Sequence, residues 1–383
     1  MIPYGKQHIS QHDIDAVVDV LKSDRLTQGP KVPEFEQAIA QYCHAKFGIA
    51  VNSATSALHI ACLALDVSQG DIVWTSPVTF VASANCALYC GASIDFVDID
   101  TDTGNISILA LAEKLQQAQI NDALPKVLIP VHLAGQSCDM QAISELAQQY
   151  NVKVIEDASH AIGASYQDNP VGNCQFSEIT VFSFHPVKII TSAEGGMATT
   201  NCPTLAQKMQ QLRSHGITAE QEHMTEISHG PWYYQQIALG FNYRMTELQA
   251  ALGLSQLSAL DSFVEKRNQL AAFYDKAFAK SELSPLTQMP HSYSAYHLYI
   301  IKLPNPDKQK HKALVEQLRA KDIFAQIHYI PVHMQPYYQQ LGFNQGDFPK
   351  AERYYQQALS LPLYPYLTRE EQEYVISTVQ SLL

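Results

Sequence analysis

The sequence predicts an α/β fold, in which a large domain contains a mostly parallel, doubly wound sheet and a smaller C-terminal domain is α+β. Apolar strands alternate with amphipathic helices over the first half of the chain, which is the pattern of a parallel sheet covered by helices. Two apolar strands, at Val152–Glu156 and Ile179–Phe184, are each followed by polar residues. Open α/β sheets bind ligands at this end of their strands. Because the 383 residues exceed the usual size of one domain, we expect domains at 1–255 and 256–383.

The N-terminal part carries start signals for two helices and one strand. Ser10 and Asp13 form an S-x-x-D capping box, so the first helix should begin directly after Ser10. Pro33 fits the first position of the second helix. Ile49–Val51 is typical of a short strand, and Asn52–Ala57 forms the turn into the next helix.

The remaining elements follow the same alternation. We expect strands at 72–75, 94–97 and 127–131, and helices from about 79 to 89, from about 107 and from about 140 to 150. Residues 218–234 are polar and predict a long loop, and a long helix follows Gly240–Met245. We place the domain boundary in that helix, near Ser255–Asn268. The C-terminal domain should contain strands at 297–303 and 324–329, a helix at about 310–321 and a final acidic helix.

Composition excludes several classes of function. The net charge of −12, from 25 basic and 37 acidic residues, gives no basic surface for nucleic acid. The seven cysteines form no C-x-x-C pair and predict free thiols in a reducing cytoplasm. The sequence contains no H-E-x-x-H motif and no Cys/His cluster, so it does not suggest a metal site. The N-terminus lacks the apolar region of a signal peptide, and no apolar stretch approaches the ~18 residues of a membrane helix. We therefore expect a cytoplasmic protein that does not bind membranes.

A single lysine stands just beyond one of the two apolar strands. Lys188 follows Phe182–Phe184 after a proline turn, and acidic, small and glycine residues come next. A lysine in such a place suits a Schiff base with a carbonyl cofactor. Asp157 follows the other strand and supplies the carboxylate that a pyridinium nitrogen requires. Taken alone, Lys188 could equally be a surface lysine on a loop.

The turn at Asn52–Ala57 is a candidate phosphate site. A helix N-terminus offers unpaired backbone amides and the positive end of the helix dipole. Thr55 and Ser56 add hydroxyl donors. Ordinary N-capping by serine or threonine explains the same residues.

Three motifs in order, EDASHA, FSFHPVK and EGG, resemble the DegT/DnrJ/EryC1/StrS family of sugar-nucleotide aminotransferases, a branch of fold type I. The resemblance implies pyridoxal 5'-phosphate bound to Lys188, with Asp157 at the pyridine nitrogen. It also implies that Asn242, in the GFNYRM motif, reaches the cofactor phosphate of a neighbouring subunit in a homodimer with shared active sites; without the family, Asn242 is a helix-capping residue and Phe80 a core residue. By resemblance, the cofactor-binding residues are Ala54, Thr55, Ser56, Phe80, Asp157, His160, Ser183, Lys188 and Asn242.

Longer runs, among them MIPYGKQHIS, LKSDRLTQGP and WTSPVTFVASANCALYCGA, resemble one branch of this family. That branch implies transfer of the amino group of L-glutamate to C4 of a UDP-linked 4-keto-6-deoxy-N-acetylhexosamine (UDP-2-acetamido-2,6-dideoxy-β-L-arabino-hex-4-ulose) in pseudaminic acid biosynthesis. Arg25 could meet the pyrophosphate or be a surface charge. By resemblance, the substrate-contacting residues are Tyr4, Asp24, Arg25, Leu26, Thr27, His328, Tyr329 and His333.

Three other functions compete with this interpretation. A 4-aminotransferase of another nucleotide-linked keto-sugar would share every catalytic residue named above. A nicotinamide-dependent oxidoreductase would need G-x-G-x-x-G after the first strand, where this chain has NSATSA. A non-catalytic cofactor-binding regulator would carry an added DNA-binding module, and the net charge does not suit DNA.

Overall fold

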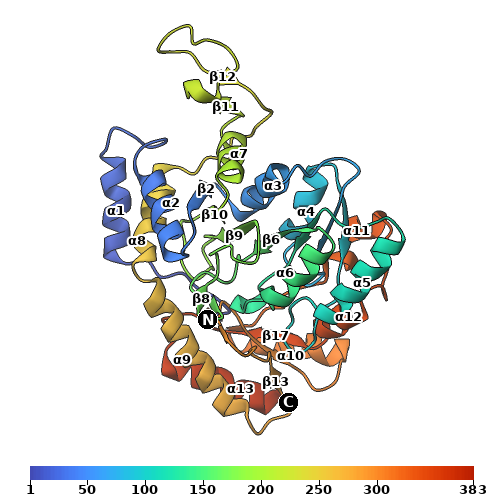
Figure 1. Cartoon of the computed structure of the whole chain (residues 1–383). Coiled ribbons are helices and arrows are strands. Elements are labelled where there is room, and N and C mark those ends of the chain that lie inside the picture. Colours follow the sequence, from blue (N-terminus) through green and yellow to red (C-terminus); the bar gives the residue numbers. More distant parts are fainter.

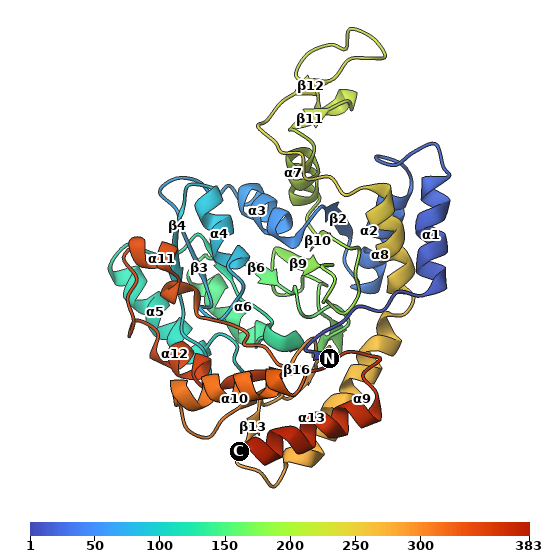
Figure 2. The ribbon, with the colours of Figure 1, turned by 180° about the vertical axis from the view of Figure 1, so that it is seen from behind.

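The computed structural model describes residues 1–383 and centres on a seven-stranded sheet (Figures 1 and 2). All neighbouring strands run parallel except one, which is antiparallel to both of its neighbours. This confirms the predicted α/β class with a mostly parallel sheet. The strand order is β2 (Phe47–Val51), β10 (Gly196–Thr200), β9 (Ile179–Ser183), β6 (Lys153–Asp157), β5 (Val127–Ile129), β3 (Ile72–Thr75) and β4 (Ser93–Phe96).

The antiparallel strand β10 was absent from the sequence prediction. Its residues, GMATT, are small and lack the branched and aromatic run that marks β9. The strand nevertheless forms because its backbone pairs with β2 on one side and β9 on the other. A sequence pattern cannot show pairing between segments so far apart in the chain.

Helices cover both faces of the sheet (Figure 1). One face packs against α3 (Ala54–Ala64), α4 (Ala82–Tyr89) and α7 (Pro203–Arg213). Side chains on alternate positions of the strands reach the other face, where they meet α2 (Lys31–Tyr42), α5 (Ile108–Ile120), α6 (Met140–Gln149) and α8 (Glu247–Leu257). This is the doubly wound arrangement that the alternating pattern predicts.

The two N-terminal helix starts differ in outcome. The capping box at Ser10 is confirmed: its hydroxyl accepts from the Asp13 amide at the start of α1 (Gln11–Leu21). The predicted start of α2 at Pro33 is wrong, because α2 begins at Lys31. The Glu247 carboxylate, far away in sequence, accepts from the amides of Lys31 and Val32 and so allows the earlier start.

The single long helix expected after residue 245 is two helices, α8 and α9 (Leu260–Phe278). The break coincides with a change of packing partner. Helix α8 packs on α1 and α2, whereas the later part of α9 belongs to the C-terminal core. The division at 255/256 stays a prediction, and the N-terminal strand β1 (Ile2–Pro3) pairs with β16 (Ile323–Phe324) of the C-terminal part.

The C-terminal part combines a three-stranded antiparallel sheet with helices. The sheet contains β13 (Ser284–Pro285), β15 (Tyr299–Lys302) and β17 (Ala358–Leu361), and α9, α10 (Lys308–Ala320) and α13 (Arg369–Leu382) pack around it. The predicted strand at 324–329 is wrong beyond residue 324, because β16 is only two residues long. The chain then forms a loop, 325–331, that reaches the large domain. Short elements complete this part: α11 (Pro336–Gln340), α12 (Pro349–Tyr355) and β14 (Ser292–Tyr293), the last paired with β7 (Ser165–Tyr166), which in turn pairs with β8 (Asn169–Pro170).

An arm projects from the body at the end of α7 (Figures 1 and 2). The short strands β11 (Ile217–Thr218) and β12 (Gln235–Gln236) pair at its base, and the loop predicted from 218 to 234 lies between them. Large apolar side chains along the arm are exposed, among them Ile227 (83%), Trp232 (76%) and Leu239 (81%). None of the helices has both the length and the apolar character that crossing a bilayer requires.

Candidate active site

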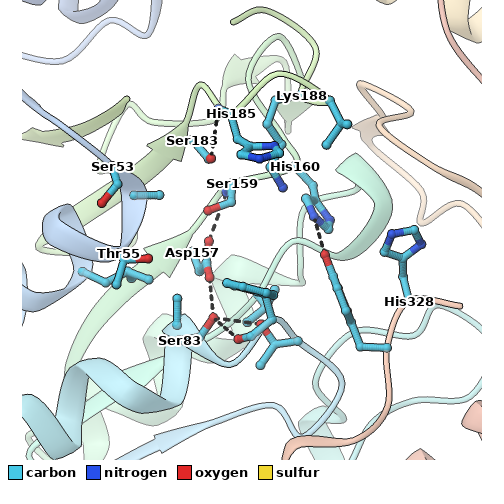
Figure 3. A pocket seen from close by; sticks show the side chains of 18 of the residues that line it. Ser53, Thr55, Ser83, Asp157, Ser159, His160, Ser183, His185, Lys188 and His328 are labelled. Atoms are coloured by element: carbon cyan, nitrogen blue, oxygen red, sulfur yellow. Dashed lines mark hydrogen bonds between the residues drawn. The ribbon is translucent and has the colours of Figure 1, made fainter. Parts of the chain in front are cut away.

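A cavity of about 480 Å³ opens at the carboxyl ends of the central strands and is lined by 20 residues (Figure 3). Loop 325–331 closes one side of it. The structure brings ten of the residues singled out from the sequence to this cavity: Tyr4, Ala54, Thr55, Phe80, Asp157, His160, Ser183, Lys188, His328 and Tyr329.

Asp157 lies in the floor of the cavity, at the end of β6. Ser83 donates a 2.5 Å hydrogen bond to one carboxylate oxygen, and the Ser159 amide donates a 3.1 Å bond to the other. Ser83 is itself held by a 2.8 Å hydrogen bond to Thr79. The carboxylate is therefore fixed in orientation while it still faces the cavity (Figure 3).

Lys188 reaches the cavity from the turn after β9. Strands β6 and β9 are parallel neighbours, with Asp157 paired to Val181, so their two following turns lie side by side. Burial lowers the pKa of Lys188 to about 8, while the negative charge of Asp157 acts in the opposite direction. The amine is thus largely available as a nucleophile at mildly alkaline pH.

The pKa of Lys188 gives a direct prediction for the cofactor-free protein. The rate at which pyridoxal phosphate attaches should rise with pH and reach half of its maximum near pH 8. In Asp157→Asn the midpoint should move to lower pH, because the carboxylate that raises the pKa has been removed. Stopped-flow absorbance over a pH series measures both midpoints. A wild-type midpoint near that of free lysine, about 10.4, would contradict the burial argument.

The first turn of α3 forms the opposite wall of the cavity. The Ser53 hydroxyl caps the helix by accepting from the Ser56 amide at 3.1 Å. The amides of Ala54 and Thr55, which lie at the helix start, have no partner within the helix. With the hydroxyls of Thr55 and Ser183 also lining the cavity, this wall offers several donors to an anion.

Gly196, in the EGG motif, lets β10 approach this helix start. A Cβ at Gly196 would lie 2.5 Å from the Ala54 amide nitrogen and 2.5 Å from the Ser53 carbonyl. Both are backbone atoms, which cannot yield as a side chain can. The glycine therefore fixes the place of the amides that face the cavity.

Gly196→Ala should displace the start of α3 and lower both stability and phosphate affinity. We expect a loss of about 1–3 kcal/mol in the free energy of unfolding, the usual cost of overpacking. Denaturant unfolding and titration with inorganic phosphate measure the two effects. Gly5→Ala is the matched control, because its Cβ would meet nothing closer than 3.8 Å. Equal behaviour of the two variants would refute this role of Gly196.

Neutral imidazoles line the side of the cavity near the loop. The His160 ring lies 4.3 Å from that of His297, and its Nε2 is 3.1 Å from the Tyr329 hydroxyl. Burial holds the pKa of His160 well below its usual value, and the charge of Lys188 adds to this effect. Burial likewise lowers the pKa of His328 to about 3. Lys188 and Asp157 are consequently the charged pair inside the cavity, with Glu194 at its exposed edge.

Two predicted contacts are corrected by the structure. Ser56 is buried, with its hydroxyl donating to Asn52 Oδ1 at 2.7 Å, so it does not line the cavity. His333 is fully buried in a 3-10 helix (Val332–Met334), and its Nε2 lies 3.0 Å from Glu352 Oε1. Both side chains are used for packing within the protein.

Asn242 and the stretch Asp24–Thr27 lie outside the cavity of their own chain and are exposed to solvent. They belong to one region of the surface. The Glu247 amide, five residues after Asn242, donates to the Leu26 carbonyl at 3.0 Å. The structure therefore does not bring these predicted contacts to the cavity of their own chain.

Several lining residues were missed by sequence reasoning. Ser83 was missed because a single serine among the small residues of α4 gives no sequence signal, and its contact with Asp157 joins distant segments. Ser53 lies in the predicted turn at Asn52–Ala57 but was not singled out, although it caps α3 and also lines the cavity. The others that line the cavity are Leu58, Thr79, Ala82, Val131, Ser159, His185, Val187 and Glu194.

The arrangement suits pyridoxal phosphate. The amides that start α3 fit a phosphate, Lys188 fits an aldehyde and Asp157 fits a protonated ring nitrogen. The buried Nδ1 of His160 has no hydrogen-bond partner in the protein and can meet a polar atom in the cavity. The donor set therefore matches each polar end of this cofactor.

Known proteins share this architecture. The model of the DegT/DnrJ/EryC1/StrS aminotransferase family matches residues 7–380. A UDP-4-amino-4,6-dideoxy-N-acetyl-β-L-altrosamine transaminase of Campylobacter jejuni is 39% identical over 385 residues, covering 100% of this chain and 98% of the relative. The spore coat polysaccharide biosynthesis protein SpsC of Bacillus subtilis is 38% identical, with 100% and 97% covered.

Solved structures are similarly close. Helicobacter pylori PseC, an aminotransferase involved in the biosynthesis of pseudoaminic acid, superposes with a TM-score of 0.90 at 33% identity, covering 100% of this chain and 98% of that one. The PMP form of Spr1654 from Streptococcus pneumoniae gives 0.91 at 30% identity, covering 100% and 99%.

Proposed function

Because the chain belongs to the DegT/DnrJ/EryC1/StrS family and is a pyridoxal-phosphate-dependent aminotransferase, we propose that its acceptor is a UDP-linked 4-keto-6-deoxy-N-acetylhexosamine. The proposed reaction transfers the amino group of L-glutamate to C4 of UDP-2-acetamido-2,6-dideoxy-β-L-arabino-hex-4-ulose. The product is UDP-4-amino-4,6-dideoxy-N-acetyl-β-L-altrosamine, for pseudaminic acid biosynthesis. We place the reaction in the cytoplasm, because the seven free cysteines are typical of a reducing compartment and nucleotide-sugar substrates would be supplied there.

The observation that carries this proposal is the full-length identity of 39% to a transaminase of that name. The match spans the whole chain and so covers the loop at 325–331, which supplies His328 and Tyr329 to the cavity. Tyr4 lies on the same side, with its ring 5.0 Å from that of His328. These three side chains line one side of the cavity, where we propose that the acceptor sugar binds.

Five residues of the cavity would have distinct tasks in this reaction. Bound pyridoxal phosphate supplies a carbonyl that accepts amines and a ring that withdraws electrons from the adjacent carbon. Lys188 would hold that carbonyl, and its amine, when free, would be placed to move the proton at the donor's Cα. Asp157 would balance the protonated ring nitrogen, and Ser83 holds the carboxylate in place. His160 and Tyr329 close the side of the cavity and exclude water.

We also propose a homodimer in which two chains share each active site. Two features support it. Asn242 and residues 24–27 are exposed on one region of the surface, and the projecting arm exposes several large apolar side chains. Exposed apolar groups of this extent are typical of interaction surfaces. In a twofold dimer, each chain would offer its Asn242 to the phosphate in the other chain.

Mixing two inactive variants tests the shared site. Lys188→Ala and Asn242→Ala homodimers should each be impaired, but a mixed dimer contains one site with both residues intact. After unfolding and refolding of an equal mixture, activity should recover to roughly a quarter of wild type, as random pairing gives. Refolded single variants are the controls. No recovery above their sum would place Asn242 in the site of its own chain or in a structural role.

A second candidate is a 4-aminotransferase of another nucleotide sugar, favoured by the 38% identity to SpsC. Steady-state release of 2-oxoglutarate separates the two. With L-glutamate, kcat/KM should be at least about a hundredfold higher for the UDP-linked N-acetylated keto-sugar than for a dTDP-linked 4-keto-6-deoxyglucose. The opposite ranking would keep the aminotransferase and remove the proposed acceptor.

A further inference from the structure

Asn242 belongs to a short extended segment, 241–244, whose packing sets the direction of its side chain. The rings of Phe241 and Tyr243 stack on each other at 4.9 Å, and they lie 4.8 and 5.9 Å from the ring of His59 on α3. The Tyr243 hydroxyl is also 3.2 Å from His59 Nδ1. Because side chains alternate between the two sides of an extended segment, Asn242 points away from α3, and it is exposed to solvent.

Backbone hydrogen bonds hold this segment from two sides. The Phe241 amide donates to the Leu212 carbonyl at 2.6 Å. The Tyr243 amide donates to the Arg213 carbonyl at 3.0 Å. On the other side, the Tyr243 carbonyl accepts from the Asn52 amide at 2.8 Å. The place of the whole segment thus depends on the end of α7 and on the turn that follows β2.

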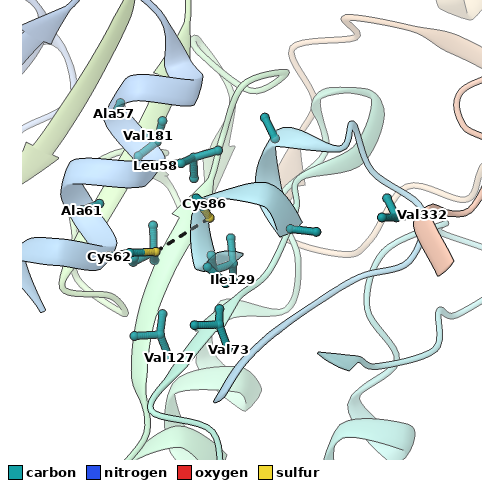
Figure 4. Close-up of a cluster of buried hydrophobic side chains, with 14 of the residues drawn as sticks. Ala57, Leu58, Ala61, Cys62, Val73, Cys86, Val127, Ile129, Val181 and Val332 are labelled. Carbon is teal, nitrogen blue, oxygen red and sulfur yellow. Dashed lines mark hydrogen bonds between the residues drawn. The ribbon is translucent and has the colours of Figure 1, made fainter. Parts of the chain in front are cut away.

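Helix α3 gives the two stacked rings a fixed support. Ala57, Leu58 and Ala61 of this helix are buried in one core cluster with Val181 of β9 and Ile129 of β5 (Figure 4). A helix packed in this way cannot shift without loss of core contacts. Movement of the segment would therefore depend on its backbone partners.

A charged pair stands where one of these partners begins. Strand β2 is at the edge of the sheet, so its outer backbone groups have no neighbouring strand. Glu36 of α2 accepts from the Ala50 amide at 2.8 Å, and Arg213 donates to the Ala50 carbonyl at 2.7 Å and to the Glu36 carboxylate. The side chains of Arg213 and Glu36 are only 15% and 13% exposed. The pair thus joins the last residue of α7 to the edge of the sheet by charge-assisted hydrogen bonds.

Loss of the Arg213 side chain would affect segment 241–244 more than β2. All five residues of β2 pair with β10 on the inner side, and Arg213 does not take part in that pairing. The segment instead receives two of its backbone hydrogen bonds from Leu212 and Arg213 themselves. Arg213 is therefore placed to control Asn242, which lies outside the cavity of its own chain.

We propose that Arg213 and Glu36 are a positioning pair for the cofactor site of the neighbouring subunit, an inference that rests on the homodimer proposed above. The pair fixes the end of α7, the end of α7 fixes segment 241–244, and the segment directs Asn242 outward. Substitution of Arg213 in one chain should then weaken cofactor retention in the site of the other chain.

Arg213→Gln should release the lysine-bound cofactor about tenfold faster than the wild type, the equivalent of one hydrogen bond to a charged group. Absorbance after rapid dilution into cofactor-free buffer measures the rate. Lys126→Gln is the matched control, because Lys126 likewise donates to a carboxylate, of Asp71 at 2.9 Å, and to a backbone carbonyl, of Asp66 at 2.6 Å. That pair lies at the amino ends of β3 and β5, away from the cavity, and its loss should not change the rate. Equal rates in the two variants would overturn the proposal.

Mixed dimers with Lys188→Ala, isolated through two different affinity tags, show in which chain Arg213 acts. Only the site that contains Lys188 gives the absorption of the lysine-bound cofactor. In a dimer of Arg213→Gln with Lys188→Ala, that site would receive Asn242 from the chain in which Arg213 is intact. Cofactor release should therefore return to the rate of a reference dimer of wild type with Lys188→Ala. Release that stays as fast as in the Arg213→Gln homodimer would place the effect within one chain and overturn the proposal.

A dimer of Asn242→Ala with Lys188→Ala separates this proposal from the shared active site. Release at the reference rate in this dimer, with fast release in the Arg213→Gln dimer, would remove the positioning pair alone. Fast release in both dimers, or two tags that do not copurify, would remove the shared site and the positioning pair together. Arg213→Lys keeps the charge without the forked geometry. It should give the same pattern with a smaller effect, and it serves as the test if Arg213→Gln does not fold.

Discussion

Lys188→Ala should lower kcat by about 10⁴-fold or more, because it removes both the amine that anchors the cofactor and the group placed to move the proton. The phosphate wall at the start of α3 is untouched, so the variant should still bind pyridoxal phosphate without a covalent bond. The rate of product release measures kcat. A fluorescence titration with pyridoxal phosphate measures the affinity for the cofactor.

Lys188→Arg is the matched control, because it keeps a positive charge near Asp157. Arginine stays protonated at neutral pH and cannot act as a nucleophile or base. Both variants should be inactive and folded, with unfolding midpoints close to that of the wild type. Retained turnover in either one would remove Lys188 from the chemistry.

Asp157→Asn should have the second largest effect. A buried cationic ring nitrogen left without its carboxylate costs about 3–5 kcal/mol, which corresponds to roughly 10²- to 10⁴-fold in rate. The side chain keeps its size and can keep a contact with Ser83, so the loss should fall on kcat and on the cofactor's absorption maximum more than on stability. Steady-state kinetics and an absorption spectrum of the loaded variant measure it.

Asp95→Asn is the matched control. Asp95 lies on β4, away from the cavity, and forms an ion pair with Lys114. The substitution should leave kcat within about twofold of the wild type, because this partly exposed ion pair lies away from the cavity and contributes little. If Asp157→Asn matched this control, the carboxylate would have no part in the reaction.

The core of the site could be predicted because it rests on strand order. Lys188 and Asp157 each follow an apolar strand, and parallel strands present their following turns at one edge of a sheet. The sequence also indicated the start of α3 as an anion site. It could not decide between Thr55 and Ser56, whose side chains point about 100° apart around the helix axis, so that only Thr55 faces the cavity.

Other parts depend on contacts between distant segments. The support of Asp157 by Ser83 joins residues 74 positions apart, and the pairing of His333 with Glu352 depends on how a loop folds. Strand β10 is small-residue sequence that pairs only because β2 and β9 leave a place for it. The exposure of Asn242 and of residues 24–27 shows that a folded single chain does not complete these predicted contacts.

The proposed acceptor is tested most directly by the second half of the reaction alone. The protein would be loaded with pyridoxal phosphate, converted with L-glutamate to its amine form and freed of donor. UDP-linked 4-keto-6-deoxy-N-acetylhexosamines would then be added one at a time. The account predicts that the absorption of the lysine-bound cofactor returns with the L-arabino sugar and not with its D-xylo epimer. Return with the D-xylo sugar alone, or only with a sugar on another nucleotide, would contradict it.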